Sequence, residues 1–182
     1  MIKNKNFYSN KIVYKPWGHE YVIYNERSKI AITLVHIKYK HKTSLHCHPK
    51  KKTGFIILSG KALVQIGIYK ENSKIFFPLS RLVFRSGLFH SIKSISKEGV
   101  YALEFETPYK KEDLIRLRDN YGRQYKNYEG KNFTKKISNL NLIKFRKPKI
   151  NKRFMYNFND IEVFLETINN LKNLKLKNDN SS

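Results

Sequence analysis

The sequence predicts an all-β barrel or double-sheet sandwich followed by a helical extension. Between Ile30 and Glu106 the apolar residues come in short runs rich in β-branched and aromatic types, a composition typical of strands. Turn residues separate the runs, and nothing helical fits between them. After Gly130 the chain becomes rich in Lys and Asn. We therefore assign residues 1–130 to a β-barrel domain and residues 131–182 to an extension.

The predicted strands follow one another closely along the first domain. KPWGHEYVIY, at 15–24, is a lead-in strand after a Pro-Trp-Gly corner. The later strands come from the runs IAITLVHI, FIILSGKALVQIGI, KIFFPLSRLVF and VYALEFE. Turns are predicted at 59–61, 86–87 and 97–99, each of which contains a glycine. Strands this short and this closely spaced favour a closed or two-layered sheet.

The extension is predicted to contain one amphipathic helix at 159–176. Asn159 is a suitable N-cap, with Glu162 three residues later. The apolar residues that recur at helical spacing are Ile161, Phe164, Leu165, Ile168, Leu171 and Leu174. Such a stripe is expected to pack on the barrel or on a second subunit, and we expect a homodimer. The terminal KNDNSS is expected to be disordered.

The composition favours a soluble, cytoplasmic protein. The single cysteine, Cys47, cannot form an internal disulfide. The first residues, MIKNKNFYSNKIVYK, lack the apolar stretch of a secretory leader. No apolar run in the sequence approaches the roughly 20 residues that a membrane helix needs.

The formal net charge of +23 raises nucleic-acid binding as an alternative function. The lysines, however, are scattered from Lys3 to Lys177 among many Asn and Ile residues, and the arginines are few. This distribution favours a solvated basic surface over a nucleic-acid site. A basic surface is expected to attract anionic small molecules, sugar phosphates among them.

Three histidines are candidate metal ligands. His46 and His48 would point to the same face of a strand, because alternate residues of a strand share a side. His90 follows a glycine turn at the start of a strand-like segment, so a barrel could bring it to the same interior point. Three histidines plus solvent form a competent zinc site. Cys47 and His41 are expected to point away from it. The alternative is an exposed, polar strand end.

The spacing of these histidines resembles the first cupin motif, G-x5-H-x-H-x(3,4)-E-x6-G, with Gly60 as the closing glycine. Gly87 and His90 similarly match part of the second motif. The resemblance covers roughly residues 15–130. It implies a small jelly-roll barrel in which the histidines bind a divalent metal, zinc first, with manganese, cobalt, iron or nickel as alternatives.

The sequence departs from the cupin motifs at several positions. Thr53 stands where the motif has its glutamate ligand, and Lys40 replaces the opening glycine. The second-motif positions that differ are Leu79, Arg85 and Ser94. Without the glutamate, a two-histidine, one-carboxylate iron site is not expected. A set of three histidines alone should bind metal more weakly and leave its charge uncompensated.

Two further stretches, KPWGHEY and EDLIRLRDNYGR, resemble motifs of type II mannose-6-phosphate isomerases and their relatives in surface-sugar synthesis. In that family, arginines near the second motif help to bind or turn over the sugar phosphate, which by position implicates Arg116 and Arg123. Guanidinium groups suit phosphate oxygens, which they bind in a bidentate manner. Tyr121 and Lys15 are further candidate substrate-binding residues in the same stretches. The alternative is a charged loop with weak surface ion pairs.

Isomerisation of an aldose to a ketose needs a cation to polarise the carbonyl and a base near the transferred proton. Glu104 and Glu106 share one face of a predicted strand and could point into the barrel or into solvent. We assign catalysis to Glu104 and Arg116. The sequence thus favours a metal-dependent isomerase or epimerase of a sugar phosphate or nucleotide sugar. A non-catalytic sugar-binding cupin, acting as a sensor or accessory subunit, is the alternative.

Overall fold

The structure is a computed structural model in which the chain divides into two compact units, residues 1–141 and 142–182. The residues that it describes are 8, 11–26, 29–126, 128–129, 131–136, 145–158 and 161–170. Gly130, where the sequence placed the domain edge, lies outside the described residues, as does the terminal KNDNSS. Each unit is considered by itself.

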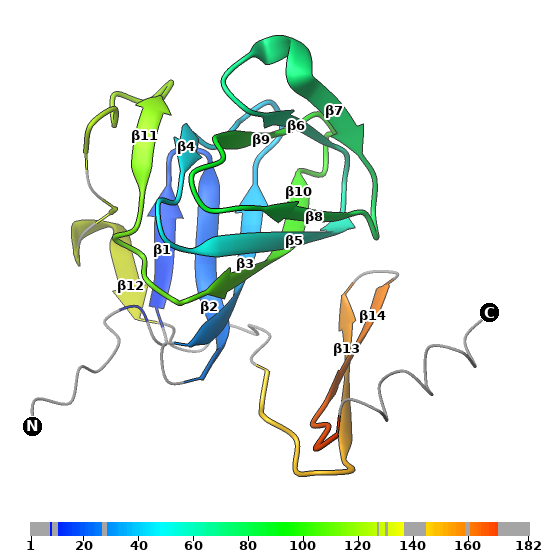
Figure 1. Ribbon diagram of the computed structural model, residues 1–182. Helices are drawn as coiled ribbons and strands as arrows, with labels where there is room; N and C mark the ends of the chain where they lie inside the picture. Colours follow the sequence, from blue (N-terminus) through cyan, green and yellow to red (C-terminus); the bar gives the residue numbers. More distant parts are fainter. Residues whose placement is uncertain are drawn as a thin grey trace, which may run out of the picture. The chain divides into compact units, whose positions relative to one another are not determined.

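The first unit consists of two antiparallel sheets (Figure 1). The order in the seven-stranded sheet is β12-β1-β2-β3-β10-β5-β8, and the order in the five-stranded sheet is β11-β4-β9-β6-β7. The strands are β1 (Lys11–Lys15), β2 (Gly18–Glu26), β3 (Ile30–Ile37), β4 (Leu45–Cys47), β5 (Lys52–Ser59), β6 (Ala62–Ile66), β7 (Ser73–Phe76), β8 (Arg81–Phe84), β9 (His90–Ser94), β10 (Val100–Thr107), β11 (Ile115–Arg118) and β12 (Thr134–Lys136). Short 3₁₀ segments are η1 (Lys70–Asn72) and η2 (Lys131–Phe133). Within the described ranges, no helix is long and apolar enough to cross a membrane.

The predicted all-β class is confirmed, and the reason lies in the alternation along the strands. Every second residue of β3 and β10 points between the sheets, where Val35 and Ala102 are cross-strand partners. Val64 and Ile92 meet them from the five-stranded sheet. The buried core that results is Trp17, Val35, Ile37, Phe55, Ile57, Ala62, Val64, Leu82, Phe84, Ile92, Val100 and Ala102. Burial of this apolar surface holds the two sheets together.

The turn predicted at 59–61 connects strands of different sheets. Gly60 has φ +79°, a conformation that residues with a Cβ rarely adopt. A Cβ there would lie 1.9 Å from the carbonyl oxygen of Gly99. The chain can therefore leave β5 and enter β6 at this point only because residue 60 has no side chain. The long apolar run FIILSGKALVQIGI accordingly forms two strands.

The helix predicted in the second unit is wrong over its described part. β13 (Arg153–Phe158) and β14 (Ile161–Glu166) form an antiparallel two-stranded sheet. Val163 and Leu165 alternate along β14, and their cross-strand partners are Tyr156 and Phe154. The apolar residues of β14 fit a strand period as well as a helical one, and an apolar partner strand just upstream favours the sheet. Asn159, Leu171 and Leu174 lie outside the described residues.

Candidate functional site

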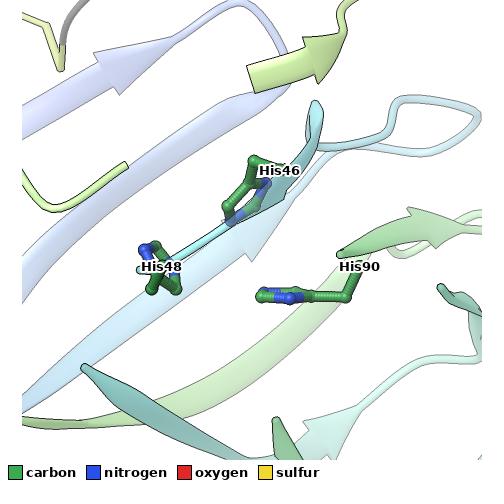
Figure 2. Close-up of side chains that lie close together, drawn as sticks. All are labelled: His46, His48 and His90. Atoms are coloured by element: carbon green, nitrogen blue, oxygen red, sulfur yellow. The ribbon is translucent and has the colours of Figure 1, made fainter. Parts of the chain in front are cut away.

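The three predicted metal ligands converge between the two sheets. His46 lies on β4, His48 directly follows that strand, and His90 begins β9, where it is the cross-strand partner of His46. Figure 2 shows the three side chains around one point. One nitrogen from each ring lies within 4.8 Å of the corresponding nitrogen of the other two. Adjacent antiparallel strands thus bring together histidines that are far apart in sequence.

Backbone carbonyls hold each imidazole in one orientation. The Nδ1 atoms of His46, His48 and His90 lie 2.8, 2.6 and 3.0 Å from the carbonyl oxygens of Ser44, Asp113 and Leu88. A carbonyl can only accept, so each Nδ1 carries the proton and donates it, which leaves the Nε2 lone pair available. The Nε2 atoms of His48 and His90 are buried without a hydrogen-bond partner among the described residues.

Burial keeps these imidazoles neutral. It lowers the pKa of His48 to about 3 and that of His90 to about 4, and it places the pKa of His46 well below its ordinary value. Neutral imidazoles with available Nε2 lone pairs and carbonyl-anchored N–H groups are a donor set that suits a divalent metal. The residues present therefore fit the metal that the cupin resemblance implies.

The histidines line a cavity of about 620 Å³, including the part that opens to solvent. Apolar walls come from Trp17, Val35, Phe55, Ile92 and Leu114. Among the predicted site residues, those that line it are Lys15, His46, His48, His90, Glu104, Arg116 and Arg123. Tyr121 does not line it and instead accepts a hydrogen bond from the backbone N–H of Lys42. His41 stacks on Tyr121, and Cys47 is buried outside the cavity lining.

The cavity also contains charged and hydrogen-bonding groups that the sequence did not predict. Lys51, Lys111, Glu20 and Tyr128 all line it. Lys51 lies in the run Lys50–Lys52, whose flanking lysines are exposed while Lys51 itself is buried. The alternation that buries Phe55 and Thr53 continues back to Lys51, so strand periodicity was a signal that could have identified it. The remaining three have no comparable local signal.

A chain of buried ion pairs begins at Glu106, whose side chain is fully buried. Lys51 Nζ lies 2.5 Å from Glu106 Oε1, and Lys111 Nζ lies 2.9 Å from Oε2. Thr33 also donates its hydroxyl proton to this carboxylate. Burial alone would raise the pKa of Glu106, but the two ammonium groups outweigh it and lower the pKa to about 2.

The same chain continues from Lys111 across the cavity. Lys111 Nζ lies 3.2 Å from Glu20 Oε1, and Lys15 contacts both Glu20 and Glu129. Tyr128 donates its hydroxyl proton to Glu20 and lies beneath the Lys15 ammonium, which is 3.7 Å from its ring centroid. Glu20 therefore stays ionised: burial opposes its charge, but Lys111 and Lys15 lower its pKa to about 2.

The two predicted arginines end the chain of ion pairs. Both form ion pairs with Glu129: Arg116 Nη2 lies 3.2 Å and Arg123 Nη1 lies 2.5 Å from Glu129 Oε1. Arg123 also bonds the buried carboxylate of Asp119 at 2.7 Å. The Arg116 guanidinium is almost completely buried, so the alternative of an exposed loop with weak surface ion pairs does not describe it. Glu129, which joins both arginines to Lys15, was not predicted.

Glu104 differs from the other carboxylates of the cavity. It is buried, as is Glu106, so both side chains point inward and the solvent-facing alternative is wrong. No salt bridge to Glu104 is present in the described part of the chain, whereas Glu106 has two. Burial, followed by the charge of Glu106, raises the pKa of Glu104 to about 7. A carboxyl with this pKa can both donate and accept a proton near neutral pH.

Replacing Glu104 by Gln should stabilise the protein at high pH. Folding raises the pKa of this group from 4.5 to about 7, so the folded state resists ionisation between these values and stability falls as pH rises through them. The amide does not ionise. We expect Glu104→Gln to match the parent near pH 4 and to exceed it by up to about 3 kcal/mol above pH 7. Urea unfolding across this range measures the difference; the exposed Glu98→Gln is the control, and a constant difference would contradict the raised pKa.

Comparison with known proteins identifies the family of the chain. The family model Mannose-6-phosphate isomerase C-terminal matches residues 3–119, which is well over half of the chain. The chain belongs to this family. The part of the chain that matches the mannose-6-phosphate isomerase C-terminal family includes the three histidines and Arg116. Arg123 and Glu129 lie after the matched range. No curated protein matches the chain.

This member of the mannose-6-phosphate isomerase C-terminal family is also similar to several solved structures. Oxalate decarboxylase of Lactobacillus farciminis aligns with TM-score 0.50 and 20% identity, over 58% of this chain and 33% of that one. The Schizosaccharomyces pombe Cnp3 cupin domain aligns with TM-score 0.46 and 19% identity, over 50% and 64%. A Klebsiella pneumoniae protein with a double-stranded β-helix domain aligns with TM-score 0.49 and 14% identity, over 55% and 79%.

Proposed function

We propose that the protein binds a divalent metal through His46, His48 and His90 and isomerises a phosphorylated sugar of the mannose 6-phosphate type in surface polysaccharide synthesis. The observation that carries this proposal is one cavity that combines three convergent imidazoles, two of them with a buried Nε2 lone pair, with a carboxyl whose pKa is about 7. A metal bound there would polarise the sugar carbonyl. Zinc suits three imidazoles, and cobalt, manganese, iron and nickel are alternatives.

The charge of the cavity supports an anionic substrate. Its cations are Lys15, Lys51, Lys111, Arg116 and Arg123. Four carboxylates bonded to them, those of Glu20, Glu106, Glu129 and Asp119, are ionised, while Glu104 is largely protonated below pH 7. The cavity therefore has an excess of positive charge even without a metal. A phosphate dianion is attracted to it, and a cationic ligand is disfavoured.

Glu104 is proposed to move the proton between the two neighbouring carbons of the sugar. Its raised pKa means that the carboxylate and the carboxylic acid are both populated near neutral pH, so the same group can take the proton from one carbon and return it to the other. The apolar wall of Phe55 and Leu114 limits water at the reacting carbons. Glu104 lines the cavity beside the three histidines, and its substitution tests this role.

Arg123 and Arg116 are proposed to bind the phosphate. A guanidinium has five N–H groups, and the described contacts of Arg123 to Asp119 and Glu129 engage three of its nitrogens without exhausting those donors. The bonded carboxylates hold both arginines in fixed orientations beside the cavity. Preorganised guanidinium groups lose less conformational entropy when the phosphate binds.

Isotope exchange tests the proposed reaction directly. We expect proton NMR in deuterated water to show exchange at C2 of mannose 6-phosphate with added zinc, cobalt or manganese, together with formation of fructose 6-phosphate. Glu104→Gln should abolish both while it retains the metal, because the metal ligands are unchanged. Sugar binding without exchange or product in the parent protein would instead support a non-catalytic sugar-binding cupin, the alternative that Thr53 at the motif glutamate position favours.

Replacing Arg116 and Arg123 together by Gln should weaken binding of the sugar phosphate. Each charge-assisted hydrogen bond that is lost should cost about 1.5 to 3 kcal/mol, which is roughly a 10- to 100-fold loss of affinity for each. Isothermal titration with mannose 6-phosphate measures it, and far-ultraviolet circular dichroism monitors folding. The exposed Arg118→Gln should bind like the parent. An unchanged affinity in a folded double variant would remove the phosphate assignment.

A further inference from the structure

We infer that Lys51 makes the binding of metal and the binding of an oxyanion at this site mutually dependent. The inference rests on the metal site of the proposed function and adds how that site is regulated. The ligand class that it names is a small oxyanion such as a phosphate monoester. The residues that carry it are Lys51, Glu106 and the three histidines.

The position of Lys51 is the first observation. Its side chain is buried, it lines the same cavity as His46, His48 and His90, and its ammonium lies 2.5 Å from Glu106 Oε1. Thr53, two residues further on, is the cross-strand partner of Glu106. Where the cupin motif has a carboxylate ligand, this chain thus has a neutral threonine beside a carboxylate that is already bonded to an ammonium group.

The charge around the histidines is the second observation. Glu106 forms ion pairs with both Lys51 and Lys111, so its single negative charge is already balanced by two ammonium groups. The Lys51 ammonium is buried and lines the cavity that also contains the three rings. A fixed positive charge at this position repels a divalent cation about twice as strongly as a monovalent one, because Coulomb energy scales with charge.

An oxyanion removes this conflict. When no sugar is bound, a tetrahedral anion in the place of the sugar carbonyl can direct one oxygen toward the cation held by the histidines and another toward the Lys51 ammonium, so that its negative charge lies between two positive ones. Metal bound alone is repelled by Lys51, and the anion alone lacks the divalent partner. Each ligand therefore raises the affinity of the other, and by thermodynamic linkage the two factors are equal.

Zinc titrations of the full-length protein test the inference without any measurement of turnover. Zinc chloride is titrated calorimetrically with and without methyl phosphate, and a blank titration of zinc into methyl phosphate is subtracted. We expect methyl phosphate to tighten zinc binding by about 10-fold or more in the parent protein. Lys51→Met should bind zinc more tightly than the parent when methyl phosphate is absent, and its coupling factor should fall toward one. Lys51→Arg keeps the charge and should retain the coupling.

Lys52→Met is the matched control, since it removes the same charge from the exposed neighbouring residue, and it should behave like the parent. Zinc binding that methyl phosphate does not change in the parent overturns the inference whether or not Lys51→Met folds. Equal zinc affinity and equal coupling in Lys51→Met and the parent also overturn it. Both results leave the proposed metal site intact, whereas a parent protein that binds no zinc with or without methyl phosphate overturns both.

Discussion

Glu106→Gln should lower the free energy of unfolding by about 3 to 5 kcal/mol at pH 7. The carboxylate is fully buried and bonded to the ammonium groups of Lys51 and Lys111. An amide of the same size leaves those two buried cations without their common counter-charge, and removing one partner of a buried ion pair is costly even where the intact pair contributes little. Urea unfolding at pH 7 measures the loss, with the exposed Glu71→Gln as the control.

The loss should depend on pH in a defined direction. The pKa of Glu106 falls from 4.5 to about 2 on folding, so its stabilising contribution is complete above pH 4.5 and disappears as pH falls toward 2. The difference between parent and variant should narrow over that window. Glu104→Gln, two residues away on the same strand, should change stability in the opposite direction above pH 7. Equal midpoints for the parent and Glu106→Gln at pH 7 would mean that the ion pairs have no net effect.

The double variant His46→Ala, His90→Ala should lose bound metal almost completely. Removing two of three ligands leaves a single imidazole. Changing a residue that only hydrogen-bonds to a metal ligand already costs about 10- to 100-fold in metal affinity, so the loss here should be larger. Elemental analysis of protein purified after zinc loading should fall from about one ion per chain toward zero. His41→Ala is the control, because its ring stacks on Tyr121 away from the cavity.

Near-ultraviolet circular dichroism distinguishes loss of metal from loss of fold. His90 stacks on Phe84 at a ring-centroid distance of 4.0 Å, so its removal also changes aromatic packing. Metal content that is substoichiometric and equal in the parent and the double variant would remove the metal site, and with it the reason for the buried Nε2 atoms of His48 and His90.

Much of the site follows from the alternation of residues along strands. His46 and His48 share a face because they are two residues apart, and the same rule applies to Glu104 and Glu106. Alternation does not determine which face of the strand is buried. The glutamates can point inward because buried lysines compensate the charge of Glu106. Those lysines, Lys51 and Lys111, come from other parts of the chain.

Two features could not be obtained from local sequence. Glu129 joins Lys15 to both arginines across more than one hundred residues, and a charge in a polar segment has no local mark of a distant partner. The segment Ile161–Glu166 contains apolar residues that satisfy helical and strand periods together, so its structure depends on pairing with β13. In both cases a contact with another segment decides the outcome.

The buried ion chain around the cavity has a consequence for the response of the protein to heat. The hydration free energy of charged groups becomes less favourable as temperature rises, so removing them from water costs less in a warm protein than in a cold one. The ion pairs that join Glu106, Lys111 and Glu20 in the cavity wall should therefore weaken relatively little on warming. Thermal unfolding would then begin elsewhere in the first unit, and the walls of the pocket would be among the last parts to separate.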